Sequence, residues 1–339
     1  MNTRFHVPTK VFGSLRSRNG ADDADGAGDG IDPRVTPASL TGADPVLIDP
    51  MPQDSPGMAA SYLIPGARTA LVDPGPATSA PGVLAALKSR RMALDVILLT
   101  HTHPDAAAGA GILARSFPGA QIAAPAETIG RLTDPAALVS DMRRVYGDKT
   151  EKLYGVPTPI DEVRIRPLSD ADRIDLGDRV IEVISTPGHT AAHVSFLDRS
   201  NGSLFCGDAL GVQLPGSSVV RPSTPPWDFS MVDSLSSIEK LSEVEAENIY
   251  LAHFGEARPG IFSRAADSLE RWHESFLRKR EQTESDEDLS RQFNACLEAS
   301  LEPIAPSVRR DLERVSPAWL NLAGLSAEQD RLGQLSDAA

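Results

Sequence analysis

Four short segments, each directly after an apolar run, constrain this chain more than any other feature of its sequence. The first is His101-Thr102-His103-Pro104-Asp105, which follows Val96–Thr100. The other three are Thr186-Pro187-Gly188-His189-Thr190, Gly207-Asp208-Ala209 and Ala252-His253-Phe254-Gly255. Functional side chains commonly stand where a strand ends and a loop begins. Four of the seven histidines of the chain occupy such positions, so we interpret the four segments together.

The residue types in these segments are those of a metal site. Residues i and i+2 of an extended segment project to the same side, so His101 and His103 can reach one ion. Pro187 and Gly188 shape a tight loop that can present a third imidazole. The remaining candidates at these strand ends are His189, Asp105, Asp208 and His253.

The pattern of apolar runs predicts strands and helices that alternate in the first half of the chain and a second half that is richer in strands; together with the resemblance described below, the fold class expected is α+β. In the first half we expect strands at 46–48, 61–64, 69–72, 96–99 and 121–123, with helices at 83–92, 106–117 and 135–146. In the second half we expect strands at 163–165, 172–174, 180–184, 194–197, 203–206 and 248–251. Asn201-Gly202 predicts a hairpin, because both turn positions accept a positive φ. The three-residue spacing of Val232, Leu235, Ile238 and Leu241 predicts a helix.

The length of 339 residues exceeds the usual size of one domain, about 100–150 residues. Residues 1–44 are rich in Gly, Asp and Ala and predict a flexible N-terminal arm. Residues 45–258 carry the four segments and predict the catalytic domain. Residues 259–339 predict a helical appendage, in which Phe262, Ala266, Leu269, Trp272 and Phe276 form one apolar stripe.

Charge and cysteine content exclude several function classes. The formal net charge of -14 repels phosphate backbones and anionic lipid surfaces, so we expect neither a nucleic-acid nor a membrane partner. The two cysteines have no CxxC spacing and offer neither a disulfide framework nor a cysteine-built metal site. The first ten residues lack an apolar signal core, and we expect a cytoplasmic protein.

From about Ala60 to Gly255 these motifs resemble, in order, the metallo-β-lactamase superfamily of metal-dependent hydrolases. Tyr62-Leu63-Ile64 and Leu71-Val72-Asp73-Pro74-Gly75 are similar to its first strands. His101, His103 and Asp105 match most of its HxHxDH signature, and the other three segments match its later motifs. The resemblance implies a four-layer αβ/βα sandwich with the metal site at one edge, between the two sheets, followed by the C-terminal helical appendage.

The resemblance also implies ligands for two ions. His101, His103 and His189 would form the first site, Asp105 and His253 would belong to the second, and Asp208 would bridge the two. The chain departs from the signature at Ala106, where the family has histidine. We therefore expect one or two divalent ions, zinc in preference to iron or manganese.

A hydrolytic reaction follows from such ligands. A divalent ion held by imidazoles lowers the pKa of its water from about 15.7 to about 7, and the resulting hydroxide attacks a carbonyl. We predict hydrolysis of a small-molecule ester, with a thioester or lactone preferred, in which Asp208 positions the nucleophile and Asp105, when no second ion is bound, serves as base. The alternatives are a non-catalytic small-molecule-binding member with an impaired second metal site, or a diiron redox protein.

Other residues have simpler interpretations. His193 and Asp73 are expected to support the ligands rather than bind metal, and Cys206 to be a small buried apolar residue. Residues Leu214–Trp227, with Met231, are expected to form part of a partly apolar substrate wall. The apolar stripe of the appendage indicates core or dimer contact, so a homodimer remains an option, as does a lid over the site.

Overall fold

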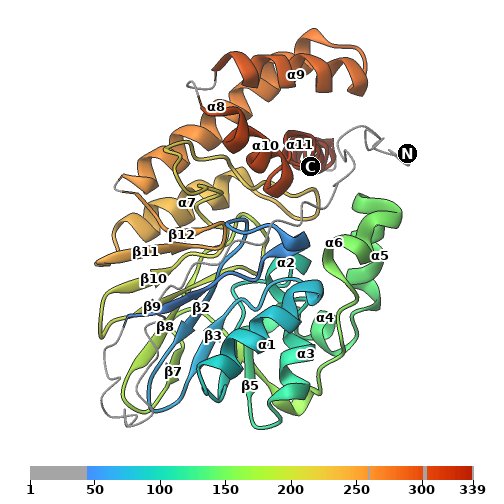
Figure 1. Ribbon diagram of the computed structural model, residues 1–339. Helices are drawn as coiled ribbons and strands as arrows, with labels where there is room; N and C mark the ends of the chain where they lie inside the picture. Colours follow the sequence, from blue (N-terminus) through green and yellow to red (C-terminus); the bar gives the residue numbers. More distant parts are fainter. Residues whose placement is uncertain (1–43, 259, 301–303, 338–339) are drawn as a thin grey trace, which may run out of the picture.

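Two six-stranded sheets form the middle of the molecule (Figure 1). The computed structural model describes residues 44–258, 260–300 and 304–337, so the predicted N-terminal arm lies almost entirely outside the described residues. The first sheet contains, in spatial order, β1 (Val46–Ile48), β2 (Ser61–Ile64), β3 (Ala70–Val72), β4 (Val96–Leu98), β5 (Gln121–Pro125) and β6 (Ile165–Leu168). The second contains β12 (Gly255–Glu256), β11 (Asn248–Leu251), β10 (Ser203–Phe205), β9 (Val194–Asp198), β8 (Val180–Ser185) and β7 (Arg173–Asp175).

Alternating side chains explain why each sheet is buried on both faces. In β2, Leu63 packs outward under helices, whereas Tyr62 and Ile64 pack against the second sheet. In β4, Ile97 points to the helices and Leu98 to the second sheet. Successive side chains of a strand point to opposite faces, so runs of apolar residues are needed to fill both interfaces.

Helices cover the outer face of each sheet, which gives the expected four layers (Figure 1). On the first-sheet side they are α1 (Ala80–Ser89), α2 (Pro104–Ala107), α3 (Ala110–Ser116), α4 (Ile129–Thr133), α5 (Ala136–Tyr146) and α6 (Thr150–Tyr154). The later helices are α7 (Met231–Ser242), α8 (Ile261–Gln282), α9 (Asp286–Ser300), α10 (Pro306–Val315) and α11 (Ala318–Asp337). Short 3-10 turns occupy 52–54, 77–79, 126–128, 147–149 and 162–164.

The apolar stripe predicted in the C-terminal appendage lies on α8 and belongs to the hydrophobic core. Leu269, Trp272 and Phe276 of α8 are buried with strand residues of the second sheet and with Phe293 of α9 and Leu325 of α11. Helix α10 packs through Leu312 against the loop that follows β10. The C-terminal helices therefore reach from the outer face of the second sheet to the edge where α2 and α6 lie (Figure 1).

The structure corrects three expectations. The helix predicted over 106–117 is two helices, α2 and α3, because Gly109 lies against the Gly75–Pro76 backbone and a Cβ there would meet the Gly75 carbonyl oxygen at 3.0 Å. The strand predicted at 163–165 begins only at Ile165, after a 3-10 turn. Val232 is 74% exposed, because the buried face of α7 runs through Met231 and Ile238 instead.

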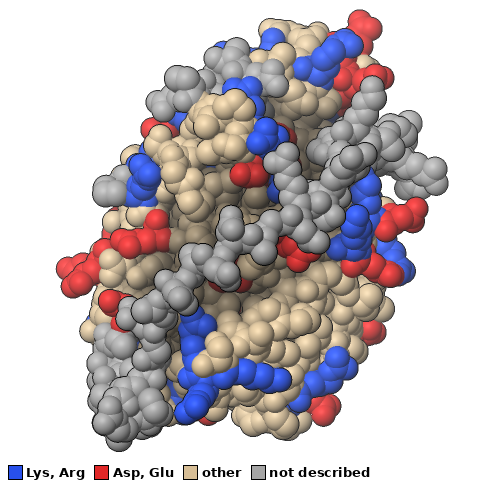
Figure 2. Space-filling view, viewed as in Figure 1, with Lys and Arg blue, Asp and Glu red and all other residues tan. Residues whose placement is uncertain are grey.

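The predicted hairpin is confirmed, with β9 and β10 antiparallel and Gly202 at φ 65°. Lys and Arg lie beside Asp and Glu over much of the face seen in Figure 2. Among the described helices, none has the length and apolar character needed to cross a membrane.

Candidate metal centre

The six predicted site residues converge at one edge of the sandwich, between the two sheets. β4 runs parallel to β3 and β5, and β10 runs parallel to β11. β8 has the same direction as β10, because both pair antiparallel with β9. The carboxyl ends of β4, β8, β10 and β11 therefore meet, and each carries its segment to the same place.

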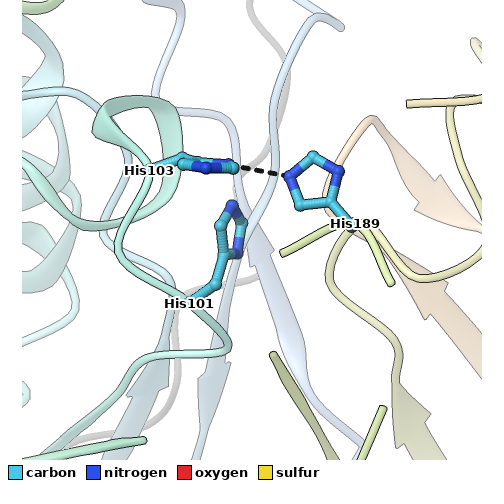
Figure 3. Close-up of side chains that lie close together, drawn as sticks. All are labelled: His101, His103 and His189. Atoms are coloured by element: carbon cyan, nitrogen blue, oxygen red, sulfur yellow. Dashed lines mark hydrogen bonds between the residues drawn. The ribbon is translucent and has the colours of Figure 1, made fainter. Parts of the chain in front are cut away.

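Three imidazoles form a first group of donors. The ligand atoms of His101, His103 and His189 lie within 4.8 Å of one another, and all three side chains are buried. Figure 3 shows their rings pointing toward one another, His101 and His103 from the segment after β4 and His189 from the opposite side. His103 Nδ1 and His189 Nε2 are 2.8 Å apart. We call these residues the imidazole triad.

Two carboxylates and the fourth imidazole form a second group. The ligand atoms of Asp105, Asp208 and His253 also lie within 4.8 Å of one another. His253 Nε2 is 3.8 Å from Asp105 Oδ2 and 3.6 Å from Asp208 Oδ1. Asp105 is partly exposed to the solvent side, whereas the other two are buried. We call these residues the mixed triad.

Asp208 joins the two groups. Its Oδ2 lies 3.6 Å from His101 Nε2 and 3.5 Å from His189 Nε2, while its Oδ1 faces the mixed triad. The bridging position expected for Asp208 is thus the position in which the structure places its carboxylate.

Hydrogen bonds on the outer ring nitrogens orient three of the imidazoles. His189 Nδ1 donates to the Ser223 carbonyl at 3.0 Å, and His253 Nδ1 donates to the Met58 carbonyl at 2.7 Å. His101 Nδ1 lies 2.9 Å from the Thr100 hydroxyl. A proton fixed on Nδ1 leaves the Nε2 lone pair free for a ligand.

Asp73 and His193 stand behind the ligands, as expected. The Thr100 amide and hydroxyl donate to Asp73 at 2.9 and 2.7 Å, so the hydroxyl oxygen remains to accept from His101. His193 Nε2 accepts from the Asp208 amide at 3.2 Å. Cys206 is fully buried in the apolar cluster behind this edge, and burial raises the pKa of its thiol.

The two triads differ in charge. Burial and the neighbouring imidazoles lower the pKa of His101, and burial together with His189 lowers the pKa of His103 to about 3. Burial also opposes charge on His253, but the carboxylates of Asp208 and Asp105 raise its pKa to about 9. At neutral pH the rings of His101 and His103 are thus neutral, whereas His253 of the metal-free protein holds a proton between the two carboxylates.

These donors fit divalent metal ions. His101 Nε2, Asp105 Oδ1 and Asp208 Oδ1 are buried polar atoms without a hydrogen-bond partner in the described chain. Leaving such atoms unpaired is costly, and all three belong to residues of the two triads. Imidazole nitrogens and carboxylate oxygens are ligands of zinc.

Ala106 leaves the mixed triad one donor short. Its methyl group is 5% exposed and borders a cavity of about 10 Å³ beside Asp105, Asp208 and His253. A cavity of this size holds at most about one water molecule. An imidazole at this position would therefore require its small neighbours, among them Ala59 and Ala60, to move.

A larger cavity of about 350 Å³ opens from the two triads to the surface. Its walls near the triads are His103, Asp105, His189 and His253, and Ser223–Pro225 with Trp227 form one side. These residues belong to the segment expected to form the substrate wall, and they line this cavity. Leu214 and Met231 do not line the cavity, because both are buried in apolar clusters instead.

The sequence did not predict the remaining walls of this cavity, which come from α5, α6, α10 and α11. The rings of Tyr146 and Tyr154 are tilted by 55° with 4.9 Å between their centroids, and the Trp319 ring of α11 lies 6.3 Å from that of Tyr146. Together with α10 they close the cavity opposite Trp227. For the helical appendage, residues 259–339, we considered a dimer contact and a lid over the site. This geometry supports the lid. The aromatic residues were visible in the sequence, but nothing local signalled that α5, α6 and α11 meet.

Comparison with known proteins identifies the family. A model of the metallo-beta-lactamase superfamily matches residues 54–253, more than half of the chain. The chain belongs to this superfamily, as its motifs indicated.

Among curated proteins, the chain is similar to hydroxyacylglutathione hydrolases. A hydroxyacylglutathione hydrolase of Vibrio cholerae is 31% identical over 184 residues, covering 54% of this chain and 58% of that protein. A hydroxyacylglutathione hydrolase of Vibrio campbellii is 30% identical over 201 residues, covering 59% of this chain and 62% of that protein. The chain thus covers less than two thirds of either relative.

Solved structures show the same fold. An archaeal metallo-beta-lactamase superfamily protein from Sulfolobus tokodaii superposes with a TM-score of 0.63 at 23% identity, covering 83% of this chain and 98% of that one. A metallo-beta-lactamase family protein from Thermus thermophilus gives a TM-score of 0.58 at 21% identity, covering 86% and 94%. The shared fold therefore extends beyond the residues that the family model matches.

Proposed function

We propose that this protein is a metal-dependent hydrolase of carbonyl esters, with a thioester as the preferred substrate and a lactone second. The observation that carries the proposal is the meeting of the two triads at Asp208, at the inner end of a cavity lined by aromatic side chains. The names of the Vibrio relatives, which are hydrolases of a glutathione thioester, support the preference.

We assign six metal ligands. His101, His103 and His189 would hold the first ion, and Asp105 and His253 a second, weaker one, with Asp208 between them. Zinc suits three imidazoles and an open coordination position. A bound divalent ion supplies a water of lowered pKa and a Lewis acid for the substrate carbonyl.

The carboxylates handle the proton. Asp208 lies against both triads and orients the attacking water through its two oxygens. The Asp105 side chain lines the cavity, and its Oδ1 has no hydrogen-bond partner in the described chain, so when no second ion is bound Asp105 would accept the proton that the water loses. Return of that proton to the departing alkoxide or thiolate completes the exchange of water for the leaving group. Trp227 and Trp319 supply apolar walls for the acyl portion.

Turnover of a substrate panel tests the function. The panel contains acyl thioesters, lactones, simple esters and a phosphodiester, each incubated with zinc-loaded protein and with the His103→Ala variant. We expect thioester or lactone hydrolysis by the wild-type protein and loss of that activity in the variant. A protein that binds metal but hydrolyses no member of the panel would instead be a binding protein, and bound iron with a visible charge-transfer band would indicate redox chemistry.

A further inference from the structure

The C-terminal helices contact the backbone that supports the imidazole triad. We propose that α11, together with Ser316 just before it, sets the geometry of the first metal site. Asn321 acts on His189, and Arg331 acts on His103. The proposal rests on the proposed function only in requiring that the imidazole triad binds a metal ion.

The first connection runs through Ser223. The carbonyl of Ser223 accepts the Nδ1 proton of His189 at 3.0 Å, and both neighbours of Ser223 are held by C-terminal residues. On one side, the Ser316 hydroxyl donates to the Pro222 carbonyl at 3.1 Å. On the other side, the Thr224 amide donates to Asn321 Oδ1 at 2.7 Å. The carbonyl that orients His189 is therefore fixed on both sides, by the residue that ends α10 and by a residue of α11.

Asn321 is itself held in one orientation. Its Nδ2 donates to the Ser316 hydroxyl at 2.7 Å, and its backbone carbonyl accepts the Thr224 hydroxyl at 2.9 Å. The side chain is 2% exposed. A buried network in which every member is satisfied rigidifies its surroundings, whereas removal of one member leaves buried groups unpaired.

The backbones of the two segments are also in direct contact. A Cβ added at Gly324 would lie 1.9 Å from the Thr224 carbonyl oxygen. Only glycine allows α11 to approach the Pro222–Thr224 segment this closely. The contact leaves little freedom for the segment to shift relative to the helix.

The second connection runs through Trp227. The Trp227 ring lies against the imidazole of His103, with 4.6 Å between ring centroids. Arg331 of α11 donates to the Trp227 carbonyl at 3.3 Å and also to the Phe229 carbonyl at 2.5 Å. Two of the three imidazoles are thus backed by residues that α11 holds, although α11 supplies no ligand of its own.

The test measures metal binding directly. Zinc affinity is determined by competition with a chromophoric chelator, and the geometry of the site by the visible absorption of the cobalt-substituted protein. The variants are Asn321→Ala, Thr224→Val and, as a matched control, Leu325→Ala. Leu325 is a buried core residue of the same helix, so its truncation lowers stability without touching the network.

We expect Asn321→Ala to weaken zinc binding about 10- to 100-fold, the usual effect of losing an outer partner of a ligand, and to change the cobalt spectrum. Thr224→Val removes the hydroxyl but keeps the hydrogen bond from the backbone amide of residue 224 to Asn321, so it should weaken zinc binding less. Leu325→Ala should lower the thermal midpoint but keep the zinc affinity and the cobalt spectrum.

Wild-type affinity and spectrum in a folded Asn321→Ala protein would overturn the inference. If that variant does not fold, unchanged zinc binding by Thr224→Val would overturn it equally, as would a loss of affinity in Leu325→Ala as large as in Asn321→Ala. Absence of zinc binding by the wild-type protein would instead refute the proposed function, so the two failures are distinguishable.

Discussion

The imidazole triad and the mixed triad occupy the same edge of the sandwich but are built differently. The first consists of three buried rings, each aimed by an outer contact, and burial lowers the pKa of His101 and of His103. The second has two carboxylates, one of them partly exposed, and a histidine that carries a proton in the metal-free protein. It also lacks the donor that histidine at position 106 would supply. The comparison shows that one edge of the fold can hold three supported imidazoles beside a second group of donors that is partly open to solvent and lacks a donor at position 106.

Removal of a ligand from the imidazole triad should have the largest effect. His103→Ala deletes a nitrogen donor from a group of three, so zinc affinity should fall by more than the roughly 100-fold that loss of an outer partner costs. Competition with a chelator measures this loss. His273→Ala, on the remote helix α8, is the matched control and should bind zinc normally. Equal zinc affinity of the two variants would show that the imidazole triad does not bind the ion.

The pH dependence of binding should separate the two triads. The pKa of His253 is raised from 6.5 to about 9, so this ring is protonated below that pH and its proton must leave before an ion binds. Affinity at the mixed triad should therefore rise about tenfold per pH unit between pH 7 and 9. The pKa of His103 is lowered to about 3 and that of His101 is lowered as well, so no such rise is expected from these two rings in this range. Calorimetric titrations in buffers of different ionisation enthalpy count the protons released; proton release from the first ion bound rather than the second would reverse the assignment.

Restoring the missing donor should have a smaller effect. Ala106→His adds a nitrogen beside the mixed triad and should raise affinity for the second ion about tenfold, while the small cavity there makes overpacking cost about 1–3 kcal/mol of stability. Ala106→Leu has a similar steric effect without a donor. Equilibrium dialysis with both variants checks the prediction, and unchanged second-ion affinity in Ala106→His would show that position 106 does not limit this site.

The sequence predicted which residues meet at this edge because each follows an apolar run and because their motifs resemble those of the superfamily. It could not predict the contacts that orient them. Ser223 orients His189 through a backbone carbonyl, which any residue type would provide. Asn321 lies 97 positions from its partner Thr224, and its role depends on how α11 packs. The break between α2 and α3 was missed for a related reason, because Gly109 responds to the distant backbone of Gly75 rather than to its own neighbours.

Metal stoichiometry tests the central claim most directly. The protein is purified without chelator, passed through gel filtration in metal-free buffer, and analysed for zinc, manganese and iron before and after incubation with excess zinc. The account predicts close to one tightly held ion per chain after gel filtration and a second ion that binds only in the presence of excess zinc. A chain that retains no ion, or one that retains two equally well, would contradict it.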